Sequence, residues 1–338
     1  MKNYFFYAWV LLLLLVSTSL HASKVDELGQ CTMKQKQFEM VQFSVQQIKE
    51  FARDFWPGWE PEEVPIYFAE QSGEVIVFNS AGVPKNSNSN CLFAEKTIYQ
   101  LTQKKELERK FFAYAIMDMD MDNGLASIHI DDPELMGDSI IDWVTVFVHE
   151  FFHVFQYAQA DWLQLFEKTG SLAENVPHLS ELYRGSINHR NNITKQLTLI
   201  KQIIFLAEKP RRKDLVQLLE FRAEHKKLLD EIHPGLAEQE QAMEIFEGVG
   251  RFVETSFYER PDLVDAAATF YKVNYNKSIE ANIKAALSVS GEYYYATGYG
   301  MSKILEMTGE KWKEKIANNG FDALLKLHLD QSEKLGSK

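Results

Sequence analysis

The chain has 338 residues, with 36 Lys and Arg against 48 Asp and Glu and a formal net charge of −12. Hydrophobic residues make up 46% and charged residues 25%, values typical of a globular protein, which exclude a disordered or collagen-like chain. The acidic balance argues against nucleic-acid binding, because proteins that bind nucleic acid usually carry a basic surface. Two cysteines in so long a chain exclude a disulfide scaffold.

The first 22 residues have the pattern of a secretory signal peptide. Lys2 supplies a short positive region, residues 8–16 form an apolar run, and the segment ends at the small residue Ala22. The apolar run is short for a membrane span, which needs about 20 residues, although counting it from residue 4 keeps an uncleaved anchor as an alternative. We therefore expect a periplasmic or secreted protein, with no stable membrane insertion once the signal is cleaved.

Export would place Cys31 and Cys91 in an oxidising compartment, where two thiols can pair. Their spacing excludes a CxxC metal or redox motif, so a structural disulfide between the N-terminal helix and a loop is expected. A lipoprotein signal at Cys31 is disfavoured, because Gln30 stands where lipidation signals carry a small residue.

The early part of the chain is predicted to mix helices with short strands. Apolar residues recur at helical spacing in its first segment, and β-rich runs separated by turn residues follow. The first predicted helix covers 34–55, and Pro57 prevents it from continuing. The elements predicted after it are strands over 64–68 and 75–78, a loop over 80–90, a helix over 104–114, and strands over 117–122 and 125–130.

From residue 139 onward the pattern is almost entirely helical. The predicted helices are 139–158, a hairpin of 193–207 and 215–232, then 238–258, 299–307 and 311–316. No internal repeat or low-complexity linker interrupts the chain. We therefore predict one α+β domain over 23–338, with an α/β part over 23–138 and a helical part over 139–338.

The segment His149-Glu150-Phe151-Phe152-His153 lies inside the first of these helices. Residues four apart share one helix face, so the two imidazoles can bind one metal ion. Glu150 is placed to reach a water molecule on that ion. Imidazole and carboxylate ligands with an open fourth position are typical of catalytic zinc, so Zn²⁺ is the predicted cofactor. Accidental spacing is the competing explanation, and the apolar context of the motif argues against it.

Two histidines do not complete a zinc site, and the sequence after His153 lacks the third histidine of metzincins. Glu174 has the separation used by thermolysin-like peptidases, but it lies in a stretch broken by proline. Glu247 is the stronger candidate, because the glycines after it allow its helix to approach the histidine helix closely; Glu244 is a possible substitute. Glu254, two turns further along, is expected to orient a ligand histidine.

The segments 149–156 and 247–254 together resemble the gluzincin group of zinc metallopeptidases. In that group two histidines of an HExxH helix and a glutamate of a later helix bind zinc. The resemblance implies a zincin-like fold, with a small β-containing N-terminal lobe, an active-site helix and a mainly helical C-terminal lobe. Gly250 departs from the family, which usually has alanine there, and the glutamate lies much further downstream than in thermolysin-like members.

Carried over residue by residue, the resemblance assigns three zinc ligands and a general base. The ligands are His149, His153 and Glu247, and the base is Glu150. It also implies that a tyrosine of the segment 293–300 donates a hydrogen bond to the developing oxyanion. Tyr295 is the first candidate and Tyr299 the alternative, with a purely structural aromatic cluster as the competing explanation.

The expected function is therefore an exported zinc metallopeptidase that hydrolyses peptide bonds through a zinc-bound water activated by Glu150. Endopeptidase activity is favoured over aminopeptidase activity, because the chain has no Gly-x-Met-Glu-Asn segment. The strand over 125–130 is a candidate edge strand for an extended peptide or protein substrate. Two alternatives stay open: a non-catalytic periplasmic binding or scaffold protein with a structural or vestigial zinc site, and a zinc hydrolase of non-peptide amides. Glu150 favours an enzyme, since a scaffold does not need it.

Overall fold

The structure is a computed structural model that describes most of the chain. The described residues are 35–61, 64–69, 74–78, 87–93, 96–102, 113–117, 126–131, 140–165, 179–206, 209–275, 277–289, 292–309 and 311–336. The predicted signal peptide, Cys31, the side chain of Cys91 and Glu174 lie outside them, so the predictions made for these residues stay predictions. Among the described helices, none is long and apolar enough to cross a membrane.

The chain divides into two compact units. The first comprises residues 1–46, 63–114 and 127–137, and the second comprises 47–62, 115–126 and 138–338. The first unit contains most of the sheet and the second contains most of the described helices, so the predicted α+β class is confirmed. The grouping of 23–338 into one catalytic domain stays a prediction.

A six-stranded sheet has most of its residues in the first unit, with the strand order β3-β4-β2-β1-β6-β5. Its strands are β1 (Ile66–Ala69), β2 (Glu74–Phe78), β3 (Ser87–Phe93), β4 (Lys96–Thr102), β5 (Ala113–Met117) and β6 (Ala126–Asp131). β1 pairs antiparallel with β2 and parallel with β6, with Ile66 opposite Ile128 and Phe68 opposite Ile130. These four side chains are buried, because alternate residues of a strand share one face.

The predicted strands over 64–68, 75–78 and 125–130 are confirmed as β1, β2 and β6. The prediction that β6 is an edge strand is wrong, because β6 lies between β1 and β5. The residues of a strand do not indicate which strands pair with it, so this error could not be avoided from the sequence of β6. The loop prediction is wrong from residue 87, where the polar residues of β3 gain a backbone partner in β4. The helix predicted over 104–114 is wrong at its last two residues, where β5 begins, and the rest of it lies outside the described residues.

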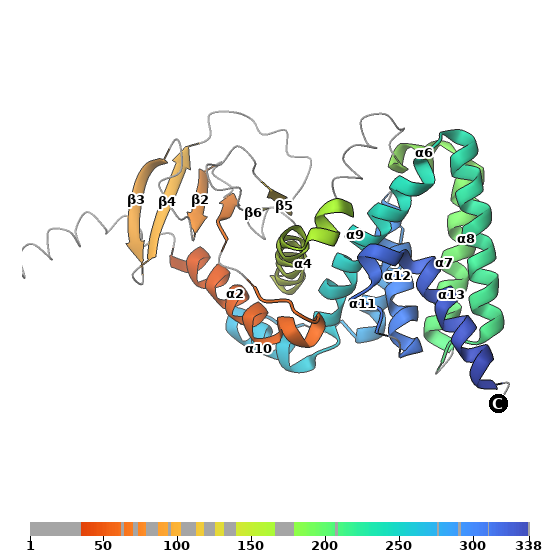
Figure 1. The fold of residues 1–338 in the computed structure, drawn as a ribbon. Coiled ribbons are helices and arrows are strands. Elements are labelled where there is room, and N and C mark those ends of the chain that lie inside the picture. The colour runs from red at the N-terminus through yellow and green to blue at the C-terminus, as the bar shows by residue number, and fades with distance from the viewer. Residues whose placement is uncertain are drawn as a thin grey trace, which may run out of the picture. The chain divides into compact units, whose positions relative to one another are not determined.

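The described helices belong to the second unit, except for residues 35–46 of the first of them. They are α2 (Gln35–Phe55), α4 (Ile140–Ala158), α6 (Leu179–Gly185), α7 (Ile187–Leu206), α8 (Arg212–Ile232), α9 (Leu236–Tyr258), α10 (Pro261–Tyr271), α11 (Ile279–Ala286), α12 (Tyr293–Thr308) and α13 (Ile316–Gly336). The helices predicted over 139–158, 193–207, 215–232 and 238–258 are confirmed as α4, α7, α8 and α9 (Figure 1). The prediction of a helix over 311–316 is wrong, since these residues form a turn and α13 begins at its end.

Helix α9 is the centre of the helical unit and packs against α4, α8, α12 and α13. Its contact with α12 brings backbone against backbone at Gly248 and Gly298. A Cβ atom on Gly298 would lie 2.2 Å from the carbonyl oxygen of Glu244, and one on Gly248 would lie 2.4 Å from the Cα of Gly298. Only glycine fits this crossing, which fixes the position of α12 along α9.

A buried ion network joins α8, α9 and α13 inside this unit. Arg222 is 3% exposed at its side chain and pairs with Glu244 at 2.7 Å and with Asp322. Lys226 contributes a second cation to Asp322 at 2.8 Å. Burial alone would raise the pKa of Asp322, but the two cations outweigh it and lower that pKa to about 2.

Replacing Asp322 with Asn is expected to reduce the free energy of unfolding at neutral pH by about 2 kcal/mol. The folded-state pKa lies below the ordinary value of 3.8, so this contribution is present above about pH 4 and is lost as the pH falls towards 2. Urea unfolding at several pH values measures it. The variant should lose less stability than the wild type between pH 4 and 2, and Asp330→Asn, an exposed residue of the same helix, should behave as the wild type.

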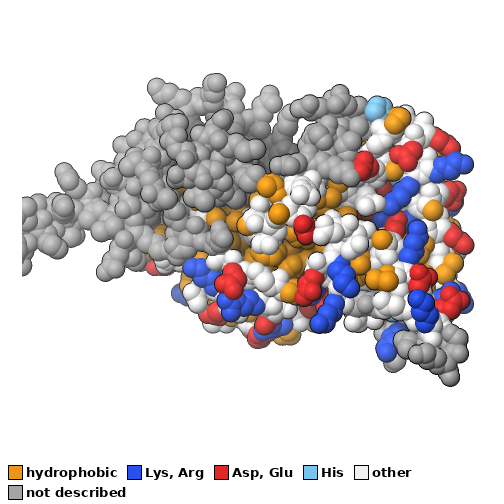
Figure 2. Space-filling model, in the orientation of Figure 1, with side chains coloured by type: hydrophobic (Ala, Val, Ile, Leu, Met, Phe, Trp, Pro, Cys, Tyr) orange, Lys and Arg blue, Asp and Glu red, His pale blue; other side chains and the backbone are white. Residues whose placement is uncertain are grey.

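Surface charges of both signs are interspersed over the helical unit on the face shown in Figure 2. Exposed ion pairs of the helical unit include Arg260 with Asp262 at 2.8 Å and Lys284 with Glu280 at 2.6 Å. Exposed pairs of this kind typically contribute less than about 1 kcal/mol each. The stability of the unit therefore comes mainly from its buried contacts.

Candidate metal centre

Helix α4 carries both motif histidines and is buried along almost its whole length. Stacking of Trp143 on Phe147 and the edge contact of Phe147 with Phe151 fill the side that faces the core. The N-terminal end of α4 is tied to α9 by the Tyr258 hydroxyl, which donates to a carboxylate oxygen of Asp142 at 2.5 Å. This link holds the two helices that supply the site in a fixed relation.

Three side chains from these two helices converge on one point. The Nε2 atoms of His149 and His153 lie 2.8 Å apart, and Oε2 of Glu247 lies 3.4 Å from the first and 3.2 Å from the second. The side chains are 6%, 6% and 17% exposed. Ligands bound tetrahedrally to zinc at about 2.0–2.1 Å are about 3.3 Å apart, so this arrangement fits one zinc ion.

The other nitrogen of each imidazole is held by an oxygen atom. Nδ1 of His149 lies 3.1 Å from Oε2 of Glu254, and Nδ1 of His153 lies 2.5 Å from Oε1 of Gln156. A neutral imidazole that donates from Nδ1 presents the lone pair of Nε2, the atom that faces the centre. Outer partners of this kind are typical of metal-binding histidines. The expected role of Glu254 as an orienting acceptor agrees with this contact.

The electrostatics of the cluster favour a positive charge at its centre. Burial alone would lower the pKa of His149, but hydrogen bonds to Glu247 and Glu254 outweigh it and raise that pKa to about 10. Burial would likewise raise the pKa of Glu247, whereas the charges and hydrogen bonds of the two histidines lower it. A proton and a divalent cation therefore compete for the same Nε2 lone pair.

Glu150 follows His149 on α4 and is 7% exposed. Its charge acts on His149, on Tyr157 of the same helix and on Tyr295, which places its carboxylate beside the cluster. Its carboxylate is not one of the three groups whose ligand atoms converge, which belong to His149, His153 and Glu247. A carboxylate next to a metal centre but outside its ligand set can serve as a proton acceptor.

Tyr295 of α12 faces the cluster. Its ring centroid lies 5.9 Å from that of His149, and its hydroxyl hydrogen-bonds to Glu247. Burial and then the charge of Glu247 raise the pKa of Tyr295 well above its usual value, so the hydroxyl stays protonated as a donor. Tyr299, the alternative, is fully buried, and its hydroxyl has no hydrogen-bond partner among the described residues. Of the two tyrosines, Tyr295 is therefore the one in contact with the cluster.

Three further residues support the cluster and were missed from the sequence. Gln156 both holds His153 and donates to the backbone carbonyl of Phe246 at 3.3 Å, while the Phe246 ring stacks on His153 with centroids 4.4 Å apart. Arg251 binds Glu254 at 3.1 Å and lies over the Tyr295 ring. Gln156 was recognisable, because it follows His153 by three residues on the same helix face. Arg251 lies three residues before Glu254 on α9 and so follows the same local spacing, whereas the stacking of Phe246 on His153 depends on the packing of two helices.

The glycines after Glu247 have separate roles. Gly250 packs on the His149 ring, so the expected close approach of α9 to the histidine helix is confirmed there. Gly248 instead contacts Gly298 of α12, which corrects the prediction for that residue. Glu244, the substitute ligand, is engaged by Arg222 in the buried ion network.

Replacing Gly250 with Ala is expected to weaken zinc binding about 10-fold, in the range seen when an orienting contact of a metal ligand is lost. The new Cβ would lie 2.8 Å from Cε1 and 2.9 Å from Nε2 of His149, so the imidazole has to move away from the centre. Competition with a chromogenic chelator measures the affinity. Gly185→Ala is the control, because its Cβ would meet nothing within 4 Å, and equal affinities in both variants would contradict the proposed contact.

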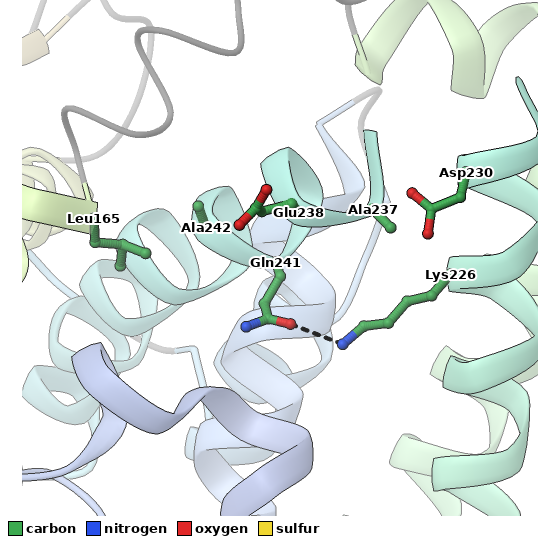
Figure 3. Close-up of a pocket in the computed structure, with 7 residues that line it drawn as sticks. All are labelled: Leu165, Lys226, Asp230, Ala237, Glu238, Gln241 and Ala242. Carbon is green, nitrogen blue, oxygen red and sulfur yellow. Dashed lines mark hydrogen bonds between the residues drawn. The ribbon is translucent and has the colours of Figure 1, made fainter. Parts of the chain in front are cut away.

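A pocket of about 280 Å³ lies elsewhere in the helical unit, between α8 and α9 (Figure 3). Lys226 and Gln241 line it and are hydrogen-bonded to each other at 2.8 Å. Lys226 is also engaged by Asp322, so the pocket offers weaker evidence for ligand binding than the histidine cluster does.

Comparisons of the chain with protein-family models, with curated proteins and with solved structures found no match.

Proposed function

We propose that this protein is an exported zinc metallopeptidase with a zincin-like catalytic fold. The observation that carries the proposal is the convergence of two imidazole nitrogens and one carboxylate oxygen within 3.4 Å of one another, from two buried helices. A scaffold protein with a structural zinc would need the same three ligands, but it would not need Glu150 beside them and outside the ligand set.

In the proposed site His149, His153 and Glu247 hold the zinc ion. Zinc supplies a Lewis acid that polarises a carbonyl group and activates water at neutral pH. Glu254 and Gln156 keep the two imidazoles in the tautomer and orientation that binding requires. Arg251 binds the second oxygen of Glu254 and keeps that carboxylate ionised.

Glu150 and Tyr295 supply the proton chemistry in this proposal. Glu150 accepts the proton of the attacking water and delivers it to the leaving amine. The Tyr295 hydroxyl donates to the oxygen on which negative charge develops, a role that requires it to stay protonated. Its raised pKa and its position beside His149 and Glu247 support this assignment.

A peptide or protein is the proposed substrate, and internal cleavage is favoured because no segment for recognising a free amino terminus is apparent in the sequence. Incubation of the mature protein with a peptide library, followed by mass spectrometry, tests this. Internal cleavage that stops on chelation and returns on adding zinc is expected. Cleavage confined to amino termini would contradict the endopeptidase assignment.

The non-catalytic alternative predicts a different outcome of the same experiment. A scaffold with a structural zinc would keep its zinc and cleave nothing in the library, and a hydrolase of non-peptide amides would cleave only such substrates. The zinc content assigned to this site is the difference between the wild type and a His149→Ala/His153→Ala variant. No difference under metal-replete conditions would contradict the metal centre itself.

A further inference from the structure

A second cluster of metal-ligating side chains lies deeper in the helical unit. His189 of α7, His225 of α8 and Glu240 of α9 offer ligand atoms that all lie within 4.8 Å of one another. The residues are 0%, 1% and 3% exposed. Nε2 of His225 lies 2.8 Å from Oε2 of Glu240, which also accepts a hydrogen bond from the Tyr293 hydroxyl of α12.

The hydrogen bonds of this cluster are incomplete. Both ring nitrogens of His189 and Nδ1 of His225 are buried and have no hydrogen-bond partner among the described residues. Each unsatisfied buried group costs about 1–3 kcal/mol, so a histidine at position 189 is an unfavourable choice for a purely structural aromatic residue. A cation bound between the three side chains would satisfy a nitrogen of His189.

The orientation of the His189 ring is fixed by its neighbours. Its centroid lies 4.8 Å from that of His225 and 4.9 Å from that of Tyr293. Tyr293 also donates to Glu240, so this tyrosine contacts two of the three side chains of the cluster.

We propose that His189, His225 and Glu240 form a second site, for a divalent transition metal of the zinc type. Two imidazoles and a carboxylate are the ligands such ions prefer. The Tyr293 hydroxyl acts as the outer partner that orients Glu240. Three helices meet at this metal, so its role is structural.

This second site supports the proposed catalytic centre through two shared helices. Glu240 and Glu247 belong to α9, and Tyr293 and Tyr295 belong to α12. Metal bound to Glu240 therefore holds the α9–α12 pair in the register that the Gly248–Gly298 crossing requires. The complete burial of all three ligands excludes a substrate from this site and distinguishes it from the first cluster.

Metal content of a set of variants tests the proposal without any assay of hydrolysis. Purified proteins are stripped, reloaded with zinc or cobalt, and freed of unbound metal. We expect two equivalents per chain in the wild type, one in His149→Ala/His153→Ala, one in His189→Phe and none in the triple variant. His233→Phe, a histidine at the end of α8 outside the cluster, is the matched control and should keep two.

Thermal unfolding provides a second readout in the His149→Ala/His153→Ala background. Adding zinc to the stripped protein should raise its Tm by several degrees, because a ligand that binds only the folded state stabilises it. His189→Phe in that background should abolish the shift. If His189→Phe fails to fold, His225→Gln takes its place, since glutamine retains a polar group for Glu240.

The His149→Ala/His153→Ala background also separates the two proposals. If it takes up no zinc or cobalt and its Tm does not respond to either ion, the second site is overturned and the cluster is a buried hydrogen-bond network. That result would leave the first site untouched. Conversely, a wild type with one equivalent that is lost only in His189→Phe would overturn the first site and support the second.

Discussion

Glu150→Gln is expected to lower peptide hydrolysis by about 10²–10⁴-fold, the usual contribution of a general base. Glutamine keeps the size and polarity of the side chain but cannot accept the proton of the attacking water. The carboxylate of Glu150 lies beside the cluster without belonging to its ligand set, so the zinc content should stay at the wild-type value. Initial rates on a library-derived peptide, paired with metal analysis of the same samples, measure both quantities.

Glu181→Gln is the matched control, because Glu181 is an exposed residue of α6. It should change neither rate nor metal content. Two outcomes for Glu150→Gln would contradict its assignment. Loss of zinc would make Glu150 a ligand, and unchanged hydrolysis would transfer the role of base to another group.

The first part of the metal centre was predictable because it is local. An i, i+4 pair of histidines in an apolar helical segment defines its own geometry, and the prediction of α4 and of the two imidazoles on one face required nothing from the rest of the fold. Glu247 required a tertiary contact, and the sequence indicated it only through the small residues that follow. Gly250 shows the physical reason, since any larger residue there meets the His149 ring.

The second cluster, the buried ion network and the order of the sheet depend on tertiary packing, which no local sequence pattern encodes. His189, His225 and Glu240 come from three helices with no motif spacing, and only the α7–α8 hairpin packed on α9 brings them together. Arg222 looked like one charged residue among many in α8, yet it is buried between Glu244 and Asp322. The interior position of β6 likewise follows from the order of the sheet and not from its own residues.

Glu247→Ala is expected to weaken zinc binding at the first site by about 10²–10⁴-fold. Structural zinc in small domains is bound with about 10–16 kcal/mol, so removing one of three protein ligands costs a few kcal/mol. The two histidines stay on α4, but their Nε2 atoms lose the carboxylate that lies 3.4 and 3.2 Å away. Chelator competition followed by metal analysis gives the affinity, and hydrolysis should fall in parallel.

The control for this variant is Glu238→Ala, an exposed glutamate on the same helix α9. It removes the same atoms from the same element, so any effect it shares with Glu247→Ala reflects the helix and not the ligand. Retention of wild-type affinity in Glu247→Ala would mean that a different residue completes the site. Glu174→Ala would then be the variant to examine, because Glu244 is engaged by Arg222 and changing it alters the ion network as well.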